Sequence, residues 1–278
     1  MLCAAGARAE DDAAFHELDS KYIFGSFTVG ASTGIEGERA FEPNTKANFG
    51  KRNGHYGASE TELEYEYTPN QYVQIELGPT VSYYDIRGVP GFDDRNMGTV
   101  NGFTAQLRSV LIDRNPSPFA VTLSVEPEFR SRDETSGVKV VNYELEAKLE
   151  ADAELIKNRL FLAFNLLYEP ETTRADMGLW QHESTVGVSS ALAFQIVPNV
   201  VIGADIWYLR HYDGFAFNNF TGDAVFVGPT LFWKISRKVL MSASWERQIA
   251  GHEVGVMPAL DLTDFSRQRA RLLLEFEF

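Results

Sequence analysis

The ten residues RARLLLEFEF, from Arg269 to Phe278, alternate between polar and apolar side chains over most of their length. Successive side chains of a strand point to opposite faces. One face therefore carries Ala270, Leu272, Leu274, Phe276 and Phe278, and the other carries two arginines, two glutamates and one leucine. This pattern is typical of a half-buried strand at a sheet edge and also of a membrane strand with one face toward lipid. The rest of the chain must decide between them.

The composition of the chain restricts which classes of protein it can belong to. The chain has 278 residues, is 44% hydrophobic and has a formal net charge of -14. It contains no run of ~18 apolar residues, so no transmembrane helix is expected; the short, half-polar strands of a membrane barrel do not need such a run. The negative charge disfavours nucleic acid as a partner. The single cysteine, Cys3, excludes a disulfide framework and a cysteine-based metal site.

The N-terminus has features of an export signal. In Ala7-Arg8-Ala9, small residues stand at the two positions that a signal peptidase reads, and acidic residues follow at once. We therefore expect residues 1–9 to be a signal-peptide remnant and residues 10–21 to be a periplasmic segment. Residues 22–278 are expected to form a single barrel domain.

Alternation and turn signals predict twelve strands. They lie near 22–33, 59–68, 71–85, 99–112, 118–131, 138–153, 158–169, 180–195, 200–212, 223–235, 239–250 and 267–278. Glycine and proline stand together inside two of them, as Gly78-Pro79 and Gly228-Pro229, and predict local bends.

The predicted connections alternate in length. The short ones are centred on 68–71, 114–118, 154–158, 197–199 and 235–238, and the mostly longer ones cover 34–58, 86–98, 132–137, 170–179, 213–222 and 251–266. This alternation is typical of an antiparallel up-and-down β-barrel with one short-turn rim and one long-loop rim. Because the strand count is even, the first strand begins and the last strand ends on the short-turn rim.

On these features the chain resembles the porin-like and channel-like β-barrels of the Gram-negative outer membrane. The resemblance implies an all-β transmembrane barrel of about 12 strands, with short periplasmic turns and longer extracellular loops. It also implies export through the periplasm, contact with outer-membrane lipids and lipopolysaccharide, and recognition by the barrel-assembly machinery. Phe276 and Phe278 would form the assembly signal on a final strand that pairs with the first. The soluble rival, a lipocalin-like barrel, has only about eight strands.

The polar strand faces would line the lumen, where acids outnumber bases about two to one. The expected pore-lining residues are Glu62, Glu64, Glu66, Glu76, Arg108, Glu126, Glu128, Arg130, Glu144, Glu146, Lys148, Asp205, Glu246, Arg269, Arg271 and Glu275. Carboxylates concentrate cations, so this wall predicts a narrow, cation-leaning pore for small polar solutes or ions. The alternative is a closed structural or adhesive barrel filled by its own Glu/Arg pairs. Twelve strands lie between plugged and wide barrels.

The sequence shows no dedicated plug. The longest connection, 34–58, contains Lys46, Lys51 and Arg52, and could fold inward against the acidic wall. A solvated surface loop is the default expectation.

An enzymatic alternative rests on WQHESTV, residues 180–186. His182 and Ser184 share the outward face, and a histidine there can activate a hydroxyl. The pair resembles the His-x-Ser of outer-membrane phospholipase A and the lipid A deacylases. That family continues with Asn-Gly, whereas Thr185-Val186 follow here. No cofactor or metal site is expected, and loop acids such as Asp261 and Asp264 are expected to be solvated.

Overall fold

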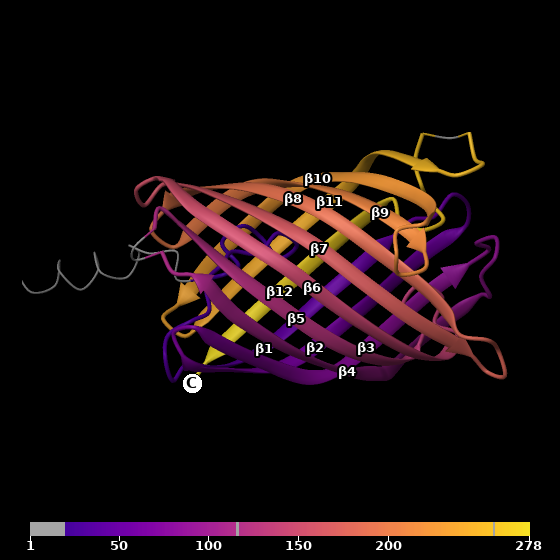
Figure 1. Cartoon of the computed structure of the whole chain (residues 1–278), viewed down its shortest axis with the longest axis horizontal. Helices are drawn as coiled ribbons and strands as arrows, with labels where there is room; N and C mark the ends of the chain where they lie inside the picture. The colour runs from indigo at the N-terminus through magenta and orange to yellow at the C-terminus, as the bar shows by residue number, and fades with distance from the viewer. Residues whose placement is uncertain (1–19, 115–116, 258) are drawn as a thin grey trace, which may run out of the picture.

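The computed structural model describes residues 20–278 apart from 115, 116 and 258, and over these residues twelve strands form a closed barrel (Figure 1). The strands are β1 (Arg39–Phe49), β2 (His55–Asn70), β3 (Val73–Arg87), β4 (Arg95–Ile112), β5 (Phe119–Arg132), β6 (Lys139–Ile156), β7 (Leu160–Ala175), β8 (Gln181–Val197), β9 (Val200–Asp213), β10 (Asn219–Ser236), β11 (Val239–Glu253) and β12 (Gln268–Glu277). Within the described part of the chain, no helix is long and apolar enough to cross a membrane.

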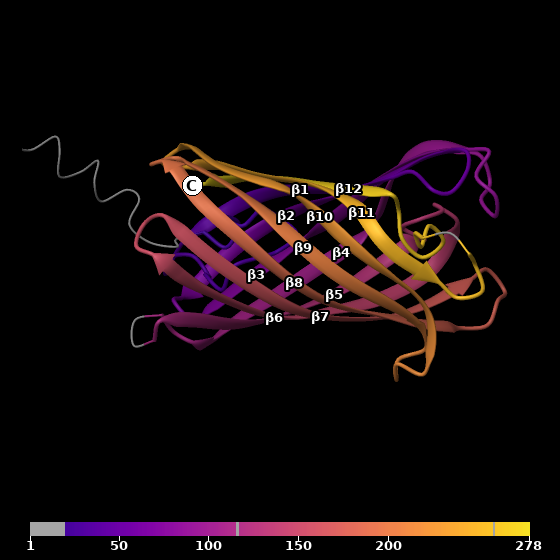
Figure 2. The ribbon, with the colours of Figure 1, turned by 90° about the horizontal axis from the view of Figure 1, so that it is seen from above.

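Every strand pairs antiparallel with its neighbours in sequence, and β12 closes the ring on β1. Lys46 of β1 stands opposite Arg271 of β12 in this closing pair. The strands run obliquely to the long axis in both views (Figures 1 and 2). The predicted up-and-down barrel is therefore confirmed, including its even strand count and the closing role of the C-terminal strand.

The two rims differ as the connections predicted. Tight connections such as 71–72, 198–199 and 237–238 lie on the same rim as the C-terminus, which Figure 1 marks on the left. The connections at the opposite rim include 88–94 and the longest one, 254–267. We call these ends the short-turn rim and the loop rim.

The expected first strand over residues 22–33 is wrong. The first strand is β1, Arg39–Phe49, inside the stretch expected to be a loop. β1 alternates only weakly, since Pro43 and several polar residues interrupt its apolar face. Residues 22–33 are more apolar, but they contain Gly25 with a φ of +96° and pair with no strand. They lie inside the barrel, where their apolar side chains pack against apolar residues of the wall.

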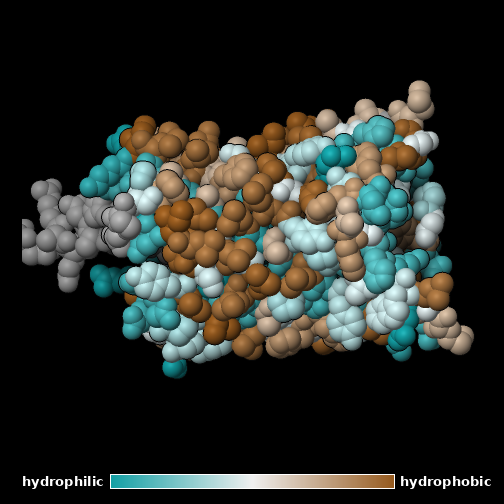
Figure 3. All heavy atoms as spheres, viewed as in Figure 1, coloured by the Kyte–Doolittle hydropathy of each residue, from teal (hydrophilic) through white to brown (hydrophobic). Residues whose placement is uncertain are grey.

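The outer surface is an apolar belt. Figure 3 shows apolar residues over the middle of one side and more polar residues toward both ends. Exposed leucines and isoleucines occur on most strands, and exposed aromatics include Tyr72, Tyr83, Trp233 and Trp245. This distribution matches a surface that faces lipid hydrocarbon, with aromatic residues at its borders.

Both Gly-Pro pairs interrupt a strand ladder without shifting its register. The β2–β3 pairing omits Gly78 and Pro79, and the β10–β11 pairing omits Gly228 and Pro229. A Cβ on Gly78 would lie 2.1 Å from the carbonyl oxygen of Leu63. The neighbouring strand therefore approaches too closely for any larger residue, and proline contributes no N–H to the ladder.

Candidate functional site: an acidic lumen with an internal segment

Residues 20–34, which we call the inner segment, lie within the barrel rather than in its wall. Phe24 has no exposed surface, and Tyr22 and Ile23 are 3% and 5% exposed. These side chains pack in one cluster with wall residues near the short-turn rim, namely Phe161, Ala163, Ala191, Ala193, Val201, Phe232, Leu240 and Leu273. The sequence analysis expected no dedicated plug, and this segment corrects that expectation. Small wall residues such as Ala163 and Ala193 make room for its aromatic rings.

Lys21 anchors the start of the inner segment. Its ammonium lies 3.0 Å from a Glu66 oxygen, forms an ion pair with Glu76 and lies 4.0 Å from Glu42. The hydroxyl of the next residue, Tyr22, donates a hydrogen bond of 2.8 Å to Glu42. All of these side chains are buried. One lysine thus partly neutralises three carboxylates that would otherwise repel one another.

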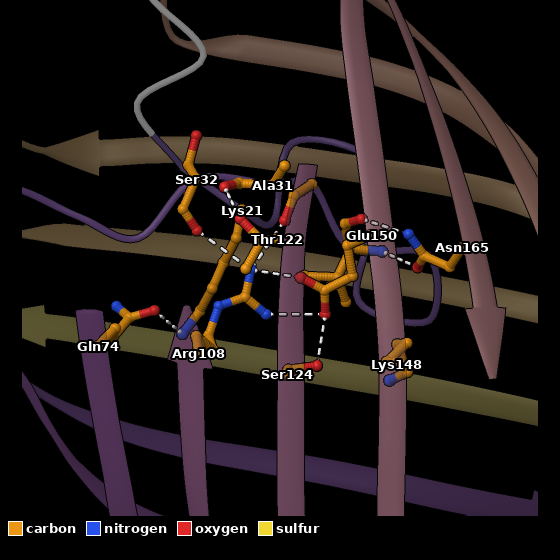
Figure 4. A network of polar contacts seen from close by, with 12 residues as sticks. Lys21, Ala31, Ser32, Gln74, Arg108, Thr122, Ser124, Lys148, Glu150 and Asn165 are labelled. Atoms are coloured by element: carbon orange, nitrogen blue, oxygen red, sulfur yellow. Dashed lines mark hydrogen bonds and ion pairs between the residues drawn. The ribbon is translucent and has the colours of Figure 1, made fainter. Parts of the chain in front are cut away.

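Wall side chains satisfy the backbone of the inner segment. The amide of Asn165 both donates to the Val29 carbonyl and accepts from the Val29 N–H, each at 2.8 Å. Arg108 donates to the carbonyls of Gly30 and Ser32 at 2.9 and 3.1 Å (Figure 4). Buried backbone groups need such partners. The segment therefore folds without a strand neighbour because the lumen supplies its hydrogen bonds.

Further contacts fix the segment at both ends. The N–H of Ala31 donates to Asp152 at 2.7 Å, and Thr122 donates to the Ala31 carbonyl at 2.6 Å. Nearer the start, a Cβ on Gly25 would lie 2.4 Å from the hydroxyl oxygen of Ser244. Glycine is required there both by this close approach and by its positive φ.

All sixteen expected lumen residues lie on the inner face of the barrel. Thirteen of them are buried, and Glu146, Arg269 and Arg271 are nearly so, with side chains 12–14% exposed. Their ion pairs join Arg108 to Glu150, Lys148 to Glu146, Arg269 to Glu246 and Arg130 to Glu128 and Glu144. The period-two spacing of these residues places them on one face of each strand. It did not predict the pairs, which depend on register.

Arg130 is the centre of the largest acidic group. Its guanidinium contacts Glu60 at 3.1 Å and Glu144 at 2.5 Å, pairs with Glu128, and lies 3.8 Å from Glu134. One arginine therefore bridges strands β2, β5 and β6 and the connection after β5. Glu60 was missed in the sequence, although it shares the parity of the glutamates that follow it on β2.

Arg269 combines an ion pair with aromatic contacts. Its Nε donates to Glu246 at 2.5 Å. Its guanidinium carbon lies 4.3 Å from the ring centre of Phe27 and 4.5 Å from that of Phe226, with Trp207 at 5.5 Å. Such cation–π contacts are strongest when they are shielded from water. They fasten the middle of the inner segment to the wall.

A cavity of about 340 Å³ lies between the inner segment and the loop rim. Phe27 lies at its floor, and its wall is mixed in charge, with Lys46, Arg130, Glu144 and Glu169 among the lining residues. A solute entering from the loop rim would meet these groups first. The lumen therefore contains a charged vestibule that the inner segment borders through Phe27.

The connection between β11 and β12 packs into the mouth of this vestibule. Lys51 donates to the carbonyls of Thr263 and Phe265 at 2.8 and 3.0 Å. Asp261 has no exposed surface, so the expectation of a solvated acid is wrong there. Burial raises the pKa of Asp261 to about 7, and the nearby Asp264 adds to the rise. Burial also lowers the pKa of Lys51 to about 8.

The His182 and Ser184 pair is not arranged for nucleophilic chemistry. The Ser184 hydroxyl donates to the carbonyl of Gly214 at 2.7 Å and is 1% exposed. Nδ1 of His182 lies 2.9 Å from the hydroxyl of Thr172, and its ring packs against Phe215. Each side chain is engaged by a different partner.

Comparison with models of protein families shows to which family the chain belongs. Residues 17–278 match the model of DUF6662, a family of unknown function. The chain belongs to DUF6662. The comparison with curated proteins gives no match for this DUF6662 chain.

Solved structures share the fold of this DUF6662 chain at low identity. One is the COG4313 outer membrane channel from Pseudomonas putida F1, with a TM-score of 0.59 and 10% identity, covering 89% of this chain and 98% of that one. Another is the NanC porin, with a TM-score of 0.52 and 12% identity, covering 86% and 100%. The chain thus has the closed β-barrel fold that these outer-membrane structures share, which is the fold that the sequence resemblance implied.

Proposed function

We propose that this DUF6662 chain is a narrow outer-membrane channel for small polar solutes or ions, with a preference for cations. The observation that carries the proposal is the charge of the interior. Among the described residues, fifteen acidic and five basic side chains are buried. An acidic, low-dielectric passage raises the local concentration of cations and repels anions. The vestibule of about 340 Å³ supplies room for a small solute near the loop rim.

The inner segment closes this channel in the conformation described. Polar contacts from the wall hold it, and such contacts can be exchanged for water one at a time. Release of residues 20–34 would open a continuous path from the vestibule to the short-turn rim. The proposed channel is therefore gated by its own chain.

The same proposal places the protein in the outer membrane, reached through the periplasm. The apolar belt would contact lipids and lipopolysaccharide. Phe276 and Phe278 are 39% and 67% exposed at the end of β12, which suits their proposed reading by the barrel-assembly machinery. Residues 1–19, which include the expected signal remnant and most of the expected periplasmic segment, lie outside the described residues.

The direct test is single-channel conductance of the refolded chain in a planar bilayer, with the reversal potential measured under a KCl gradient. We expect discrete steps and a reversal potential on the cation-selective side. Replacing Glu62, Glu64 and Glu66 together by glutamine should move the potassium-to-chloride permeability ratio toward one. Glu36→Gln, on the exposed connection before β1, is the matched control and should leave the ratio unchanged. An unaltered ratio in the triple variant would remove these residues from the selectivity assignment.

A second candidate is a closed barrel with a structural or adhesive role. The observation that favours it is the same inner segment, which fills the lower lumen and leaves only the vestibule. This candidate predicts a silent bilayer even when heat-modifiable gel mobility shows that the barrel has folded. Conductance from the full chain would reject it.

A further inference from the structure

Three carboxylates meet in the lumen, and only one of them, that of Glu62, forms an ion pair with a described residue. Glu62 and Glu64 project from β2, Glu126 projects from β5, and one oxygen of each lies within 4.8 Å of the others. They line a small enclosed cavity of about 20 Å³. Tyr22 and Val29 of the inner segment line another part of this cavity. The group therefore lies between the inner segment and the wall.

Glu64 has no partner of its own. It is 2% exposed, and no described residue forms a hydrogen bond or ion pair with its carboxylate. Glu126 accepts only from neutral donors, the hydroxyl of Thr104 at 2.7 Å and the amide of Gln106. A buried carboxylate without a cation or sufficient donors is strongly unfavourable. A bound cation would compensate these two charges, as would protonation of the carboxyl groups.

Glu62, in contrast, is compensated. Its Oε1 lies 2.7 Å from the ammonium of Lys46, and its Oε2 accepts from Asn44 at 2.7 Å. Arg271 lies 4.0 Å from the same carboxylate and donates to Asn44. Glu62 can therefore share an oxygen with a further cation while it keeps these contacts.

The other basic groups that face the cavity are already paired. Arg108 lies 2.7 Å from Glu150, and Lys148 lies 2.6 Å from Glu146. The acid Glu76, also in the cavity lining, pairs with Lys21. Two carboxylate charges, those of Glu64 and Glu126, remain uncompensated. A divalent cation would neutralise both.

In two neighbouring acidic groups, cations of the protein compensate the buried carboxylates. The group of Glu42, Glu66 and Glu76 surrounds the ammonium of Lys21. In the group of Glu60, Glu62 and Glu128, Arg130 and Lys46 supply the positive charge. Each of these groups contains a cation from the protein. In the group with Glu64, Lys46 pairs with Glu62, but Glu64 and Glu126 have no cation of their own among the described residues.

We propose that Glu62, Glu64 and Glu126 bind a calcium ion. The donors are all oxygens, which select hard cations. Oxygens around Ca²⁺ lie at 2.3–2.6 Å from the ion, so two ligand oxygens are at most about 5 Å apart, and the three carboxylate oxygens, all within 4.8 Å of one another, satisfy this limit. The three carboxylates supply at least three oxygen ligands, one from each residue. A cavity of about 20 Å³ has room for one ion or water, whereas Mg²⁺ usually retains several waters.

Equilibrium dialysis of the refolded full chain against CaCl₂, in detergent free of lipopolysaccharide, tests the site. Bound calcium is counted by elemental mass spectrometry. We expect one Ca²⁺ per chain, with at least tenfold weaker binding in Glu64→Gln and in Glu126→Gln. Glu246→Gln is the control, because Glu246 is also buried in the lumen but pairs with Arg269. It should bind calcium as the unmodified chain does.

A second probe leaves the carboxylates intact. Tb³⁺, a luminescent substitute for Ca²⁺, should emit when tyrosine is excited, because Tyr22 lines the same cavity. Added CaCl₂ should remove this emission, and Tyr22→Phe should abolish most of it.

Three results would overturn the proposal. They are no calcium bound to the folded chain at millimolar CaCl₂, unchanged affinity in folded Glu64→Gln, and displacement of calcium by an equal concentration of Mg²⁺. None of these measurements requires the barrel to conduct, so the calcium site and the proposed channel can fail independently.

Discussion

At the scale of single residues, the lumen is organised by a few cations that each serve several acids. Lys21 lies among Glu42, Glu66 and Glu76, and Arg130 lies among four glutamates. Removing one such cation leaves several buried charges without a partner, which costs about 3–5 kcal/mol for one broken pair. Individual side chains therefore control whether the inner segment stays in place.

Lys21→Met tests this control. The methionine fits the space but removes the positive charge, so the three carboxylates repel and the start of the inner segment loosens. We expect a higher open probability in single-channel recordings and faster proteolysis of residues 20–34 in the folded barrel. Lys139→Met, at an exposed lysine near the loop rim, is the control and should behave like the unmodified chain. Equal protection of the segment in both variants would show that Lys21 is not its anchor.

Phe278 tests the proposed assembly signal. The ring is 67% exposed and its centre lies 6.2 Å from that of Tyr65, so it adds little to the folded barrel. Deleting Phe278 should reduce the amount of protein in the outer membrane several-fold while the refolded protein keeps a similar Tm. Met257→Ala, at a fully exposed loop residue, is the control. Normal outer-membrane levels without Phe278 would contradict the assignment.

At the scale of elements, the positions of β1 and the inner segment are the reverse of what their sequences favour. The more apolar segment lies in the lumen, and the less apolar one forms a wall strand. Residues 22–33 have the higher apolar content, yet they lie in the lumen and bind side chains of β4 to β7. Residues 39–49 have Pro43 and a weak pattern, yet they pair with two strands along their length. Ring closure explains this outcome, since β1 must join β2 and β12 at once.

The β11–β12 connection carries a pH dependence. The pKa of Asp261 is raised to about 7 in the fold, above its ordinary value of 3.8, so the folded loop holds the proton more tightly than the unfolded one. Packing of the loop is thus most stable at low pH and weakens as the pH rises toward about 7. The charges around it are Lys51, Asp264 and Glu253.

Hydrogen exchange of residues 254–267 between pH 5 and pH 8 measures this effect, after correction for the intrinsic exchange rate. Protection should fall as the pH rises, and Asp261→Asn should make it nearly independent of pH. Asp93→Asn, at an exposed acid in the β3–β4 connection, should keep the dependence of the unmodified chain. A dependence that survives in Asp261→Asn would assign it to another group.

At the scale of the whole molecule, the outer and inner surfaces of the barrel differ in chemistry. Its outside is an apolar surface of low specificity, and its inside is a dense set of ion pairs around an internal segment. The likeness to solved outer-membrane barrels, at 10% and 12% identity, is a likeness of fold. The proposed preference for a solute or ion therefore depends on the acidic interior.

The sequence by itself determined the closed barrel, the number of its strands, the positions of all but the first of them, the two kinds of rim and the strand face of each lumen residue. These properties depend on local alternation and on turn residues, which a single strand displays. Only the tertiary structure decided that residues 20–34 enter the lumen, which cation serves which acid, and that Glu64 has none. Those outcomes depend on partners far apart in sequence, such as Val29 and Asn165, and on a register that no single strand encodes.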